Sequence, residues 1–385
     1  MRILLVNKFY DPTIGGVESV VKQHAAFLRE QGHEVTVLCC SDRFAVHTLV
    51  EEHNGVRVVR CASFGTFMSM PLAPALSLHL LRLLFWSELV IYHLPFPLAT
   101  VSALFQPVRR PVIVFWHSDI VQQKRLKPIV QFFQRALCRR ARRVLTTSPQ
   151  LLEFSEVIRD FRDKAAVVPL SVPTGGRSIA APDCRPTGLP ELPERYALFL
   201  GRLCYYKGVD VLLKALSDLS KSGNPFPVVL VGDGPLKTDV EAAIQGHDLP
   251  QVIFIDRHVD EAEKHWLLAN AWFLLFPSTQ PSEAFGIVQL EAMYHGVPVI
   301  NTSLPTGVPW VSQDQETGLT IAPDDVPALT RAFLHLMENP STRERWAKNA
   351  VARVCDHFSD DRASELLNKE IERATAGSVS VDQGS

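Results

Sequence analysis

Short apolar runs alternate with amphipathic segments along most of this chain, and each run has the length of a buried strand. Within the helical segment that follows the first run, Val17, Val20, Val21, Ala25 and Leu28 recur at helical spacing. Apolar strands that alternate with helices are typical of a mainly parallel sheet covered by helices on both faces. The pattern therefore predicts an α/β protein. In the first half the predicted strands are residues 3–6, 35–38, 56–59, 89–92, 112–116, 144–146 and 166–168.

The alternation stops between about residues 171 and 194, where Pro, Gly, Ser and Thr are frequent, and then resumes. A chain of 385 residues is also long enough for two cores. We therefore expect two doubly wound Rossmann-like domains, which cover residues 1–185, with a linker from about 171, and residues 186–357. Residues 358–375 are expected to form a C-terminal helix, and residues 376–385 a disordered tail. In the second half the predicted strands are residues 196–200, 228–231, 252–255, 272–276, 297–300 and 319–321.

Composition favours a folded protein in the cytoplasm. Hydrophobic residues make up 46% of the chain and charged residues 21%. The seven cysteines show no zinc-ligand spacing and are odd in number, which favours a reduced compartment over a disulfide framework. The first residues follow a buried-strand pattern with no basic leader or cleavage site, so we expect no secretory signal. The most apolar stretch, residues 68–86, contains Pro71, Pro74, His79 and Arg82, so we expect a helix packed on a sheet rather than a membrane span.

Charge is distributed unequally between the two halves. Residues 1–185 contain 23 Lys and Arg against 14 Asp and Glu, a balance of +9; subtraction from the totals of 39 and 41 leaves 16 against 27, or −11. Such an asymmetry indicates an anionic partner for the first half, such as phosphates or a membrane surface, or simply a solvated helix face. We expect an anionic membrane surface as a binding partner, and we do not expect nucleic acid as one. The basic residues concentrate at Arg109, Arg110, Lys124, Arg125, Lys127, Arg139, Arg140, Arg142 and Arg143.

Gly15 and Gly16 follow the first predicted strand and precede a predicted helix. Paired glycines at a strand-to-helix turn let backbone amides approach a phosphate at the positive end of the helix, although they also form ordinary turns. The segment lacks the third glycine of the dinucleotide-binding fingerprint.

Arg202 and Lys207 follow the predicted strand 196–200, just before a helix that is expected to begin near Val209. Two cations at a strand end suit a diphosphate, with a guanidinium fork from Arg202 and a point charge from Lys207. An exposed basic loop is the alternative.

Glu283, Gly286 and Glu291 follow the predicted strand 272–276. A helix that begins near Gly286 would present free amides to an anion, and a carboxylate can accept hydrogen bonds from sugar hydroxyls. Glu283 could otherwise be an ordinary residue of a helix start, and Glu291 a solvated one.

These segments, together with Trp116-His117-Ser118-Asp119 and Gly232-Asp233-Gly234-Pro235, resemble the retaining GT-B glycosyltransferases of family 4 over nearly the whole chain. The resemblance implies two Rossmann-like domains that face each other across a cleft. It implies a final helix that crosses back onto the N-terminal domain. It also implies a nucleotide-diphosphate sugar as donor substrate, with no cofactor and no metal, and retention of anomeric configuration.

The same resemblance assigns roles to individual residues. The catalytic residues would be His117 at the reaction centre, Arg202 and Lys207 at the diphosphate, and Glu283 at the donor-sugar hydroxyls. Ser118, Asp119 and Lys124 would contact the acceptor, although Lys124 could equally be solvated. Near Arg257 the chain has Asp256-Arg257 where relatives often have glycine, so the correspondence is weaker there. Donor contacts are implied for Gly15, Gly16, Gly232, Arg257, His258, Val259, Phe285, Gly286, Ile287, Val288 and Glu291.

Residues 117–124, Tyr205-Tyr206-Lys207 and residues 306–310 resemble a narrower group, the bacterial mannosyl- and rhamnosyltransferases of O-antigen or related polysaccharides. This likeness favours a GDP-sugar donor, a lipid-diphosphate-linked saccharide acceptor, and a peripheral position at the inner face of the cytoplasmic membrane. A UDP-sugar-dependent transferase acting on another glycan or small acceptor is the main alternative. A GT-B-fold sugar-nucleotide epimerase would not be expected to carry Arg202, Lys207 and Glu283 together. A silent nucleotide-sugar-binding protein would not need them. A phosphorylase would need a pyridoxal-phosphate lysine segment, which we do not find.

Overall fold

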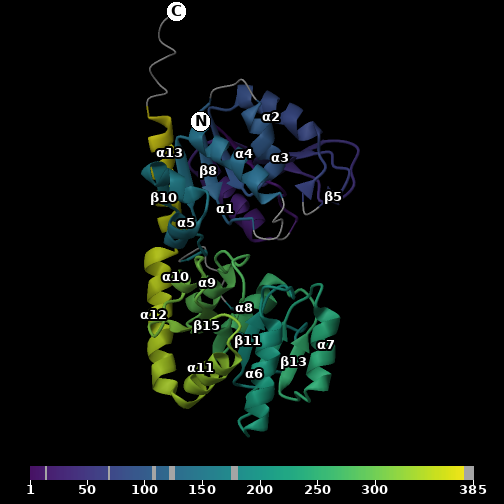
Figure 1. Ribbon diagram of the computed structural model, residues 1–385, viewed down its shortest axis with the longest axis vertical. Helices are drawn as coiled ribbons and strands as arrows, with labels where there is room; N and C mark the ends of the chain where they lie inside the picture. Colours follow the sequence, from purple (N-terminus) through teal and green to yellow (C-terminus); the bar gives the residue numbers. More distant parts are fainter. Residues whose placement is uncertain (14, 68–69, 106–109, 121–125, 175–180, 377–385) are drawn as a thin grey trace, which may run out of the picture. The chain divides into compact units, whose positions relative to one another are not determined.

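The computed structural model describes residues 1–13, 15–67, 70–105, 110–120, 126–174 and 181–376. The chain divides into two compact units (Figure 1). Unit 1 consists of Met1–Pro169 and Ala363–Ser385, and unit 2 of Leu170–Arg362. The sequence placed the start of the linker at about residue 171. The predicted tail lies outside the described residues, apart from Ala376.

Unit 1 is built on a sheet with the strand order β10-β9-β8-β7-β1-β2-β4-β3. All neighbours pair in parallel except β3, which is antiparallel to β4 at the edge. Each run predicted as a strand overlaps one of these strands. The strands are β1 (Arg2–Val6), β2 (Glu34–Cys40), β3 (Leu49–His53), β4 (Val56–Cys61), β7 (Leu89–Leu94), β8 (Val112–Trp116), β9 (Arg143–Thr146) and β10 (Ala165–Val167), with a separate hairpin of β5 (Thr66–Phe67) and β6 (Met70–Pro71).

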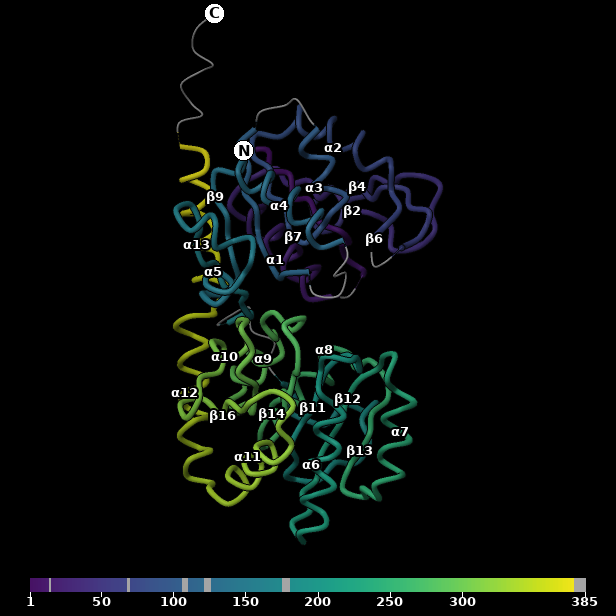
Figure 2. Tube along the Cα trace, in the orientation of Figure 1, coloured from purple at the N-terminus to yellow at the C-terminus, as the bar shows by residue number. Residues whose placement is uncertain are grey.

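Helices cover both faces of this sheet (Figure 2). One face packs on α2 (Ala75–Trp86), α3 (Pro97–Leu104), α4 (Lys127–Arg140), α5 (Pro149–Phe154) and η1 (Ile158–Lys164), through an apolar cluster that includes Leu80, Ala99 and Leu137. The other face packs on α1 (Gly16–Glu30) and on α13 (Asp360–Thr375), through Leu28, Leu367 and Ile371. The apolar stretch before residue 87 thus contributes a helix packed on the sheet, as predicted. No helix in the described part of the chain is both long and apolar enough to cross a membrane.

Unit 2 is built on a wholly parallel sheet with the order β13-β12-β11-β14-β15-β16. Each strand predicted for this half overlaps one of the observed strands. The strands are β11 (Ala197–Leu200), β12 (Val228–Val231), β13 (Val252–Ile255), β14 (Phe273–Leu275), β15 (Val299–Thr302) and β16 (Gly318–Ile321). The helices are α6 (Val209–Lys221), α7 (Lys237–Gly246), α8 (Glu261–Ala269), α9 (Ile287–Tyr294), α10 (Val308–Val311), α11 (Val326–Glu338) and α12 (Pro340–His357).

The two sheets share one topology. Counted along the parallel strands of each unit, both contain the order 3-2-1-4-5-6, to which unit 1 adds β10 and the antiparallel β3. This is the doubly wound order, in which the chain reverses direction across the sheet beside its first strand. The reversal lies between β1 and β7 in unit 1 and between β11 and β14 in unit 2. Ligands of such sheets bind beyond the carboxyl ends of the strands at this point.

Candidate active site

The reversal point of unit 2 is formed by the loops after β11 and β14, which are adjacent parallel strands. Their carboxyl ends therefore meet at one edge of the sheet. The first loop carries Arg202 and Lys207, and the second carries Glu283. Residues 76 positions apart in the sequence are brought together here because each immediately follows a neighbouring strand.

Lys207 and Glu283 form an ion pair, with Nζ and Oε2 2.6 Å apart. Both side chains are largely buried, at 12% and 10% exposure. Ser278 donates its hydroxyl to the same carboxylate oxygen at 3.1 Å, and the Lys207 ammonium lies over the Phe276 ring, 4.9 Å from its centroid. Because charges this buried are costly without a partner, each residue of the pair compensates the other.

Glycines allow the loops of unit 2 to approach one another closely. Gly208 has a φ of +69° and caps α6, and a Cβ there would collide with the Pro277 carbonyl oxygen of the loop after β14. A Cβ on Gly232, which follows β12, would likewise collide with the Gly201 carbonyl oxygen. Three loops are thus packed backbone against backbone, and no side chain larger than hydrogen fits at these two positions.

The start of α9 lies in the same region. Gly286 has a φ of +81° and is the N-cap residue, and Phe285 before it is buried. The N–H groups of Ile287 and Val288 lie in the first turn, where a helix has no acceptor of its own for them. Gln289 is fully buried and accepts from the Asn301 amide at 2.9 Å while donating to the Phe285 carbonyl oxygen at 3.0 Å. This polar network fixes the helix start, so its amides are held in place for an anion.

Glu291, in the second turn of α9, is not a solvated carboxylate. Lys264 of α8 binds its Oε1 at 2.7 Å and also binds Glu261 at 2.9 Å. Burial acts to lower the pKa of Lys264, but the Glu291 and Glu261 carboxylates more than offset this, and the pKa is raised. The pKa of Glu261 falls to about 2, mainly through its hydrogen bond with His265 and then through Lys264. Lys264 thus orients Glu291, and sequence reasoning missed this lysine because its helix offers no signal that links it to a residue 27 positions away.

The cations Arg202 and Arg257 differ in their surroundings. Arg202 is exposed, and among the described residues its guanidinium has no hydrogen-bond or ion-pair partner. Arg257 is already occupied, since it donates to both carboxylate oxygens of Glu263 at 2.7 Å and to the Gly188 carbonyl oxygen at 2.7 Å. Glu263 also completes the capping box of α8 with Asp260. The Arg257 side chain therefore braces the chain around α8, whereas the side chain of the neighbouring His258 is exposed.

In unit 1, Gly15 and Gly16 begin α1 directly after the loop that follows β1. A Cβ on Gly15 would collide with the Glu18 carboxylate, whereas a Cβ on Gly16 would meet no atom within 4 Å. Burial raises the pKa of Glu18. Arg60 of β4 stabilises the loop through the Asp11 carbonyl oxygen at 2.7 Å and is itself bound by Glu51 of β3.

His117 follows β8 and belongs to a buried group of histidines that sequence reasoning missed. Its Nε2 lies 2.9 Å from Nδ1 of His93 on β7, and the two rings are stacked. His24 of α1 lies beside His93, with ring centroids 5.6 Å apart. Burial, followed by the neighbouring His24, lowers the pKa of His117 to about 3, and burial lowers that of His24 to about 4. The group is therefore neutral near pH 7, and His117 presents an uncharged imidazole.

The predicted acceptor residues lie in different settings. Asp119 accepts hydrogen bonds from the Trp116 indole at 3.0 Å and from the Ser155 hydroxyl at 2.7 Å, so its carboxylate stabilises the turn after β8. Ser118 precedes it in the same turn and is half-buried. Lys124 lies outside the described residues. Within the described ranges, no three His, Cys, Asp or Glu side chains are arranged to hold a metal ion.

Solved structures with the same architecture are glycosyltransferases. Sucrose-phosphate synthase from Thermosynechococcus elongatus superposes with a TM-score of 0.79 at 21% identity, over 97% of this chain and 99% of its own. Anabaena HepE, solved in complex with UDP, gives a TM-score of 0.71 at 18% identity, over 97% and 100%. The fold is GT-B, and the predicted fold class is confirmed.

Sequence comparisons give the family. Residues 15–171 match the glycosyl transferase 4-like domain, and residues 185–353 match the glycosyl transferases group 1. D-rhamnosyltransferase WbpZ of Pseudomonas aeruginosa is 31% identical over 93% of this chain and 92% of its own. O-antigen chain mannosyltransferase C of Escherichia coli is 30% identical over 94% and 95%. The chain belongs to the group 1 glycosyltransferases and is of the O-antigen mannosyl/rhamnosyltransferase type.

Proposed function

We propose that this protein transfers a hexose, mannose or rhamnose, from a GDP-sugar to a lipid-diphosphate-linked saccharide, with retention of anomeric configuration and without a metal ion. The observation that carries the proposal is the buried Lys207–Glu283 pair at the reversal point of unit 2, beside the start of α9. The pair combines a cation for the diphosphate with a carboxylate for the sugar hydroxyls. The relatives named as a rhamnosyl- and a mannosyltransferase support the choice of sugar.

The chemistry that we propose is electrostatic. When the sugar leaves its donor, negative charge grows on the diphosphate oxygens. Arg202, Lys207 and the first-turn amides of α9 would stabilise that charge where it develops. Glu283 would accept hydrogen bonds from the sugar hydroxyls. The Lys207 ammonium, paired with Glu283, would also attract the phosphate oxygens. Glu291, oriented by Lys264, would accept hydrogen bonds from the ribose hydroxyls.

We further propose that unit 1 supplies the acceptor side, through the turn of Ser118 and Asp119 and the neutral imidazole of His117. An uncharged ring can accept or donate a hydrogen bond to a hydroxyl without adding a charge beside an oxocarbenium-like sugar. Because the proposed acceptor is anchored in a bilayer, the protein would act at the inner face of the cytoplasmic membrane.

The test is a donor screen with purified protein. Release of nucleotide diphosphate is measured for GDP-mannose, GDP-rhamnose, UDP-glucose and UDP-N-acetylglucosamine, with and without a synthetic lipid-diphosphate saccharide. We expect turnover with a GDP-sugar that depends on the acceptor. We also expect the product linkage, measured by NMR, to have the anomeric configuration of the donor, and the rates to be unchanged in EDTA. Complete and magnesium-reversible loss in EDTA would contradict metal independence.

A UDP-sugar donor is the second candidate. The structural neighbour HepE was solved in complex with UDP, which favours this nucleotide in a protein of the same fold. Turnover with UDP-glucose and none with either GDP-sugar would select this alternative.

A further inference from the structure

Large apolar side chains are exposed very unequally in the two units. Among the described residues, all the exposed large hydrophobic side chains except Tyr205 belong to unit 1. Single exposed apolar residues are common on soluble proteins, whereas a concentration of them on one surface marks an interaction site.

Four of these side chains lie on the outer sides of α2 and α4. Leu78 and Phe85 of α2 are 51% and 63% exposed, and Ile129 and Phe132 of α4 are 57% and 64% exposed. Leu80 and Leu84 of α2, and Leu137 and Cys138 of α4, are buried against the sheet. Both helices are therefore apolar on two sides, and only one of these sides is needed for the core. We call the outward side of α2, α3 and α4 the three-helix face.

The charge of this face is of one sign. No Asp or Glu occurs anywhere in α2, α3 or α4. Lys127 and Arg135 of α4 are compensated by Glu156 and Asp160, at 2.8 and 3.0 Å. Arg82 and Arg139 are exposed, and within the described residues neither guanidinium has an acidic partner. The face thus combines exposed apolar side chains with uncompensated positive charge.

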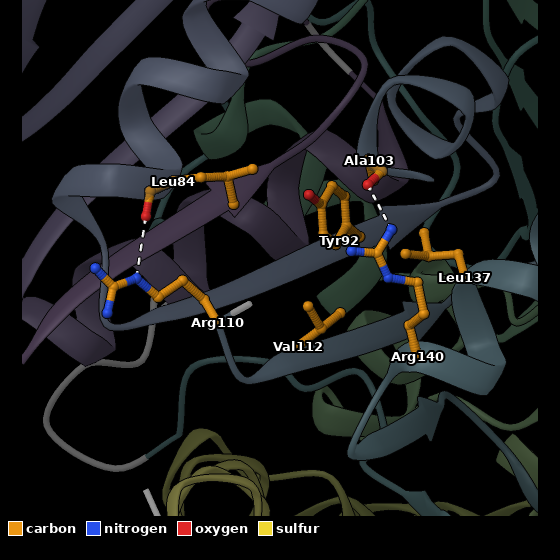
Figure 3. A pocket seen from close by; sticks show the side chains of 7 residues that line it. All are labelled: Leu84, Tyr92, Ala103, Arg110, Val112, Leu137 and Arg140. Atoms are coloured by element: carbon orange, nitrogen blue, oxygen red, sulfur yellow. Dashed lines mark hydrogen bonds between the residues drawn. The ribbon is translucent and has the colours of Figure 1, made fainter. Parts of the chain in front are cut away.

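The ends of the three helices are tied together around a small pocket (Figure 3). Arg110 donates to the Leu84 carbonyl oxygen at 3.3 Å, at the end of α2, and Arg140 donates to the Ala103 carbonyl oxygen at 2.9 Å, at the end of α3. Carbonyl oxygens at helix ends carry partial negative charge, so arginines are favourable there. Phe85 directly follows Leu84, so the hydrogen bond from Arg110 at the end of α2 also restrains Phe85. The pocket itself is lined by Leu84, Tyr92, Ala103, Arg110, Val112, Leu137 and Arg140.

We propose that the three-helix face is the surface by which this protein docks on a bilayer that contains anionic lipids. Phe85, Phe132 and Ile129 enter the boundary between headgroups and acyl chains, and Arg82 and Arg139 remain at the lipid phosphates. The inference rests on the proposed function in one respect only: docking on a bilayer would bring the protein to its lipid-linked acceptor. Charge selects the occupant, since the exposed and uncompensated charges of the three helices are positive, so two copies of the face repel each other and an anionic bilayer attracts it.

The test uses the full chain without donor or acceptor. Flotation is measured with vesicles of phosphatidylcholine alone and of phosphatidylcholine with about one-third phosphatidylglycerol, at low and high salt. We expect binding to the anionic vesicles only, weakened by salt through screening. Arg82→Gln with Arg139→Gln should weaken binding by about five-fold for each lost charge. Phe85→Ser with Phe132→Ser should weaken it by about ten-fold or more, through lost apolar insertion.

Matched substitutions outside the face give the controls. Phe44→Ser removes an equally exposed phenylalanine before β3, and Arg331→Gln with Arg345→Gln removes two exposed arginines of unit 2. These variants should bind as the unaltered protein does. All positions are exposed, so circular dichroism and the melting temperature should be unchanged.

Three outcomes would overturn the proposal: equal binding to neutral and anionic vesicles, unchanged binding of both face variants, or a dimer in sedimentation that the Phe85 and Phe132 substitutions dissociate. The last would assign the face to a second copy of the chain. The donor screen with the synthetic lipid-diphosphate saccharide is run separately. Absence of turnover with every donor, together with intact vesicle binding, would refute the proposed function and leave the docking surface standing.

Discussion

The two units share a strand order but handle charge differently at the carboxyl ends of their strands. In unit 2 three predicted donor residues lie in ion pairs, Lys207 with Glu283, and Glu291 with Lys264. In unit 1 the equivalent region holds His117, His93 and His24, which burial keeps neutral. The same topology therefore carries ion pairs near the carboxyl ends of the strands in unit 2 and a group of neutral imidazoles in unit 1. Four substitutions test whether this division is real.

The largest effect is expected at Lys207. Lys207→Ala removes a cation from the proposed diphosphate site and leaves the Glu283 carboxylate without its main partner. Losing one preplaced charge of this kind lowers kcat/KM by about 100-fold or more. Steady-state kinetics with the identified donor measures this. Lys214→Ala, on an exposed position of α6, is the control and should be silent. Unaltered kinetics in Lys207→Ala, with a normal circular dichroism spectrum, would remove this residue from the site.

Lys264 should have a smaller effect, of a different kind. Lys264→Met keeps much of the buried stem but leaves Glu291 and Glu261 without their shared cation. We expect the donor KM to rise by about ten-fold, which corresponds to about 1.4 kcal/mol, with kcat nearly unchanged, because the proposed ribose contact acts equally in ground state and transition state. Lys348→Met, an exposed substitution on α12, is the control. A fall in kcat with an unchanged KM would place Lys264 in the chemistry and not in binding.

His93 tests the neutral half. His93→Phe keeps a ring that can stack on both Phe115 and His117 but removes the 2.9 Å hydrogen bond to His117. Since one hydrogen bond contributes about 1 kcal/mol, we expect kcat to fall by about five-fold with little change in KM. If His117 does not depend on His93 for its orientation, kcat and its pH profile will both match those of the unaltered protein.

The last test concerns stability and pH, and we expect no effect on activity near pH 7. The folded pKa of His24 is about 4, below its ordinary value of 6.5, so the unfolded chain binds a proton between these values and the folded chain does not. The free energy of unfolding is therefore unaffected by His24 above pH 6.5. It decreases as the pH falls from 6.5 toward 4, because protonation of His24 favours the unfolded chain. We expect the urea midpoint to fall over this window and to fall less steeply in His24→Phe. Identical slopes for the two proteins would show that His24 does not titrate in this way.

The parallel sheets were predictable because most of their strands are short runs of apolar residues. β3 was not, since its residues LVEEH are mostly exposed and carry no apolar alternation. Its function is local, because Glu51 binds Arg60, which in turn holds the loop after β1. An edge strand that is stabilised by an ion pair and a neighbouring strand leaves little trace in a hydrophobic pattern.

The site was predictable only where a residue follows its own strand. Lys207 and Glu283 could be placed at one edge, because the doubly wound order brings their strands together. His93 could not, since its relation to His117 depends on the register of β7 against β8, which pairs His93 with Phe115. The basic excess near residue 140 was visible, but its use was not: Arg143 binds Glu370, and Arg142 donates to the Ala374 carbonyl oxygen. Those two arginines hold α13 and are not available to a membrane.

The position of α13 also has a consequence for synthesis of the protein. This helix follows unit 2 in the sequence, yet Leu367, Ile371 and Ala374 complete the core of unit 1, whose sheet begins at residue 2. On the ribosome, unit 2 has all its residues while unit 1 still lacks one of the helices that cover its sheet. Ile3, Leu5 and Ile113 belong to the apolar cluster that α13 joins, and this cluster stays incomplete until α13 has been synthesised. The first unit to be made is therefore the last to be finished, and a chain that stops before residue 360 exposes apolar surface that chaperones and proteases recognise.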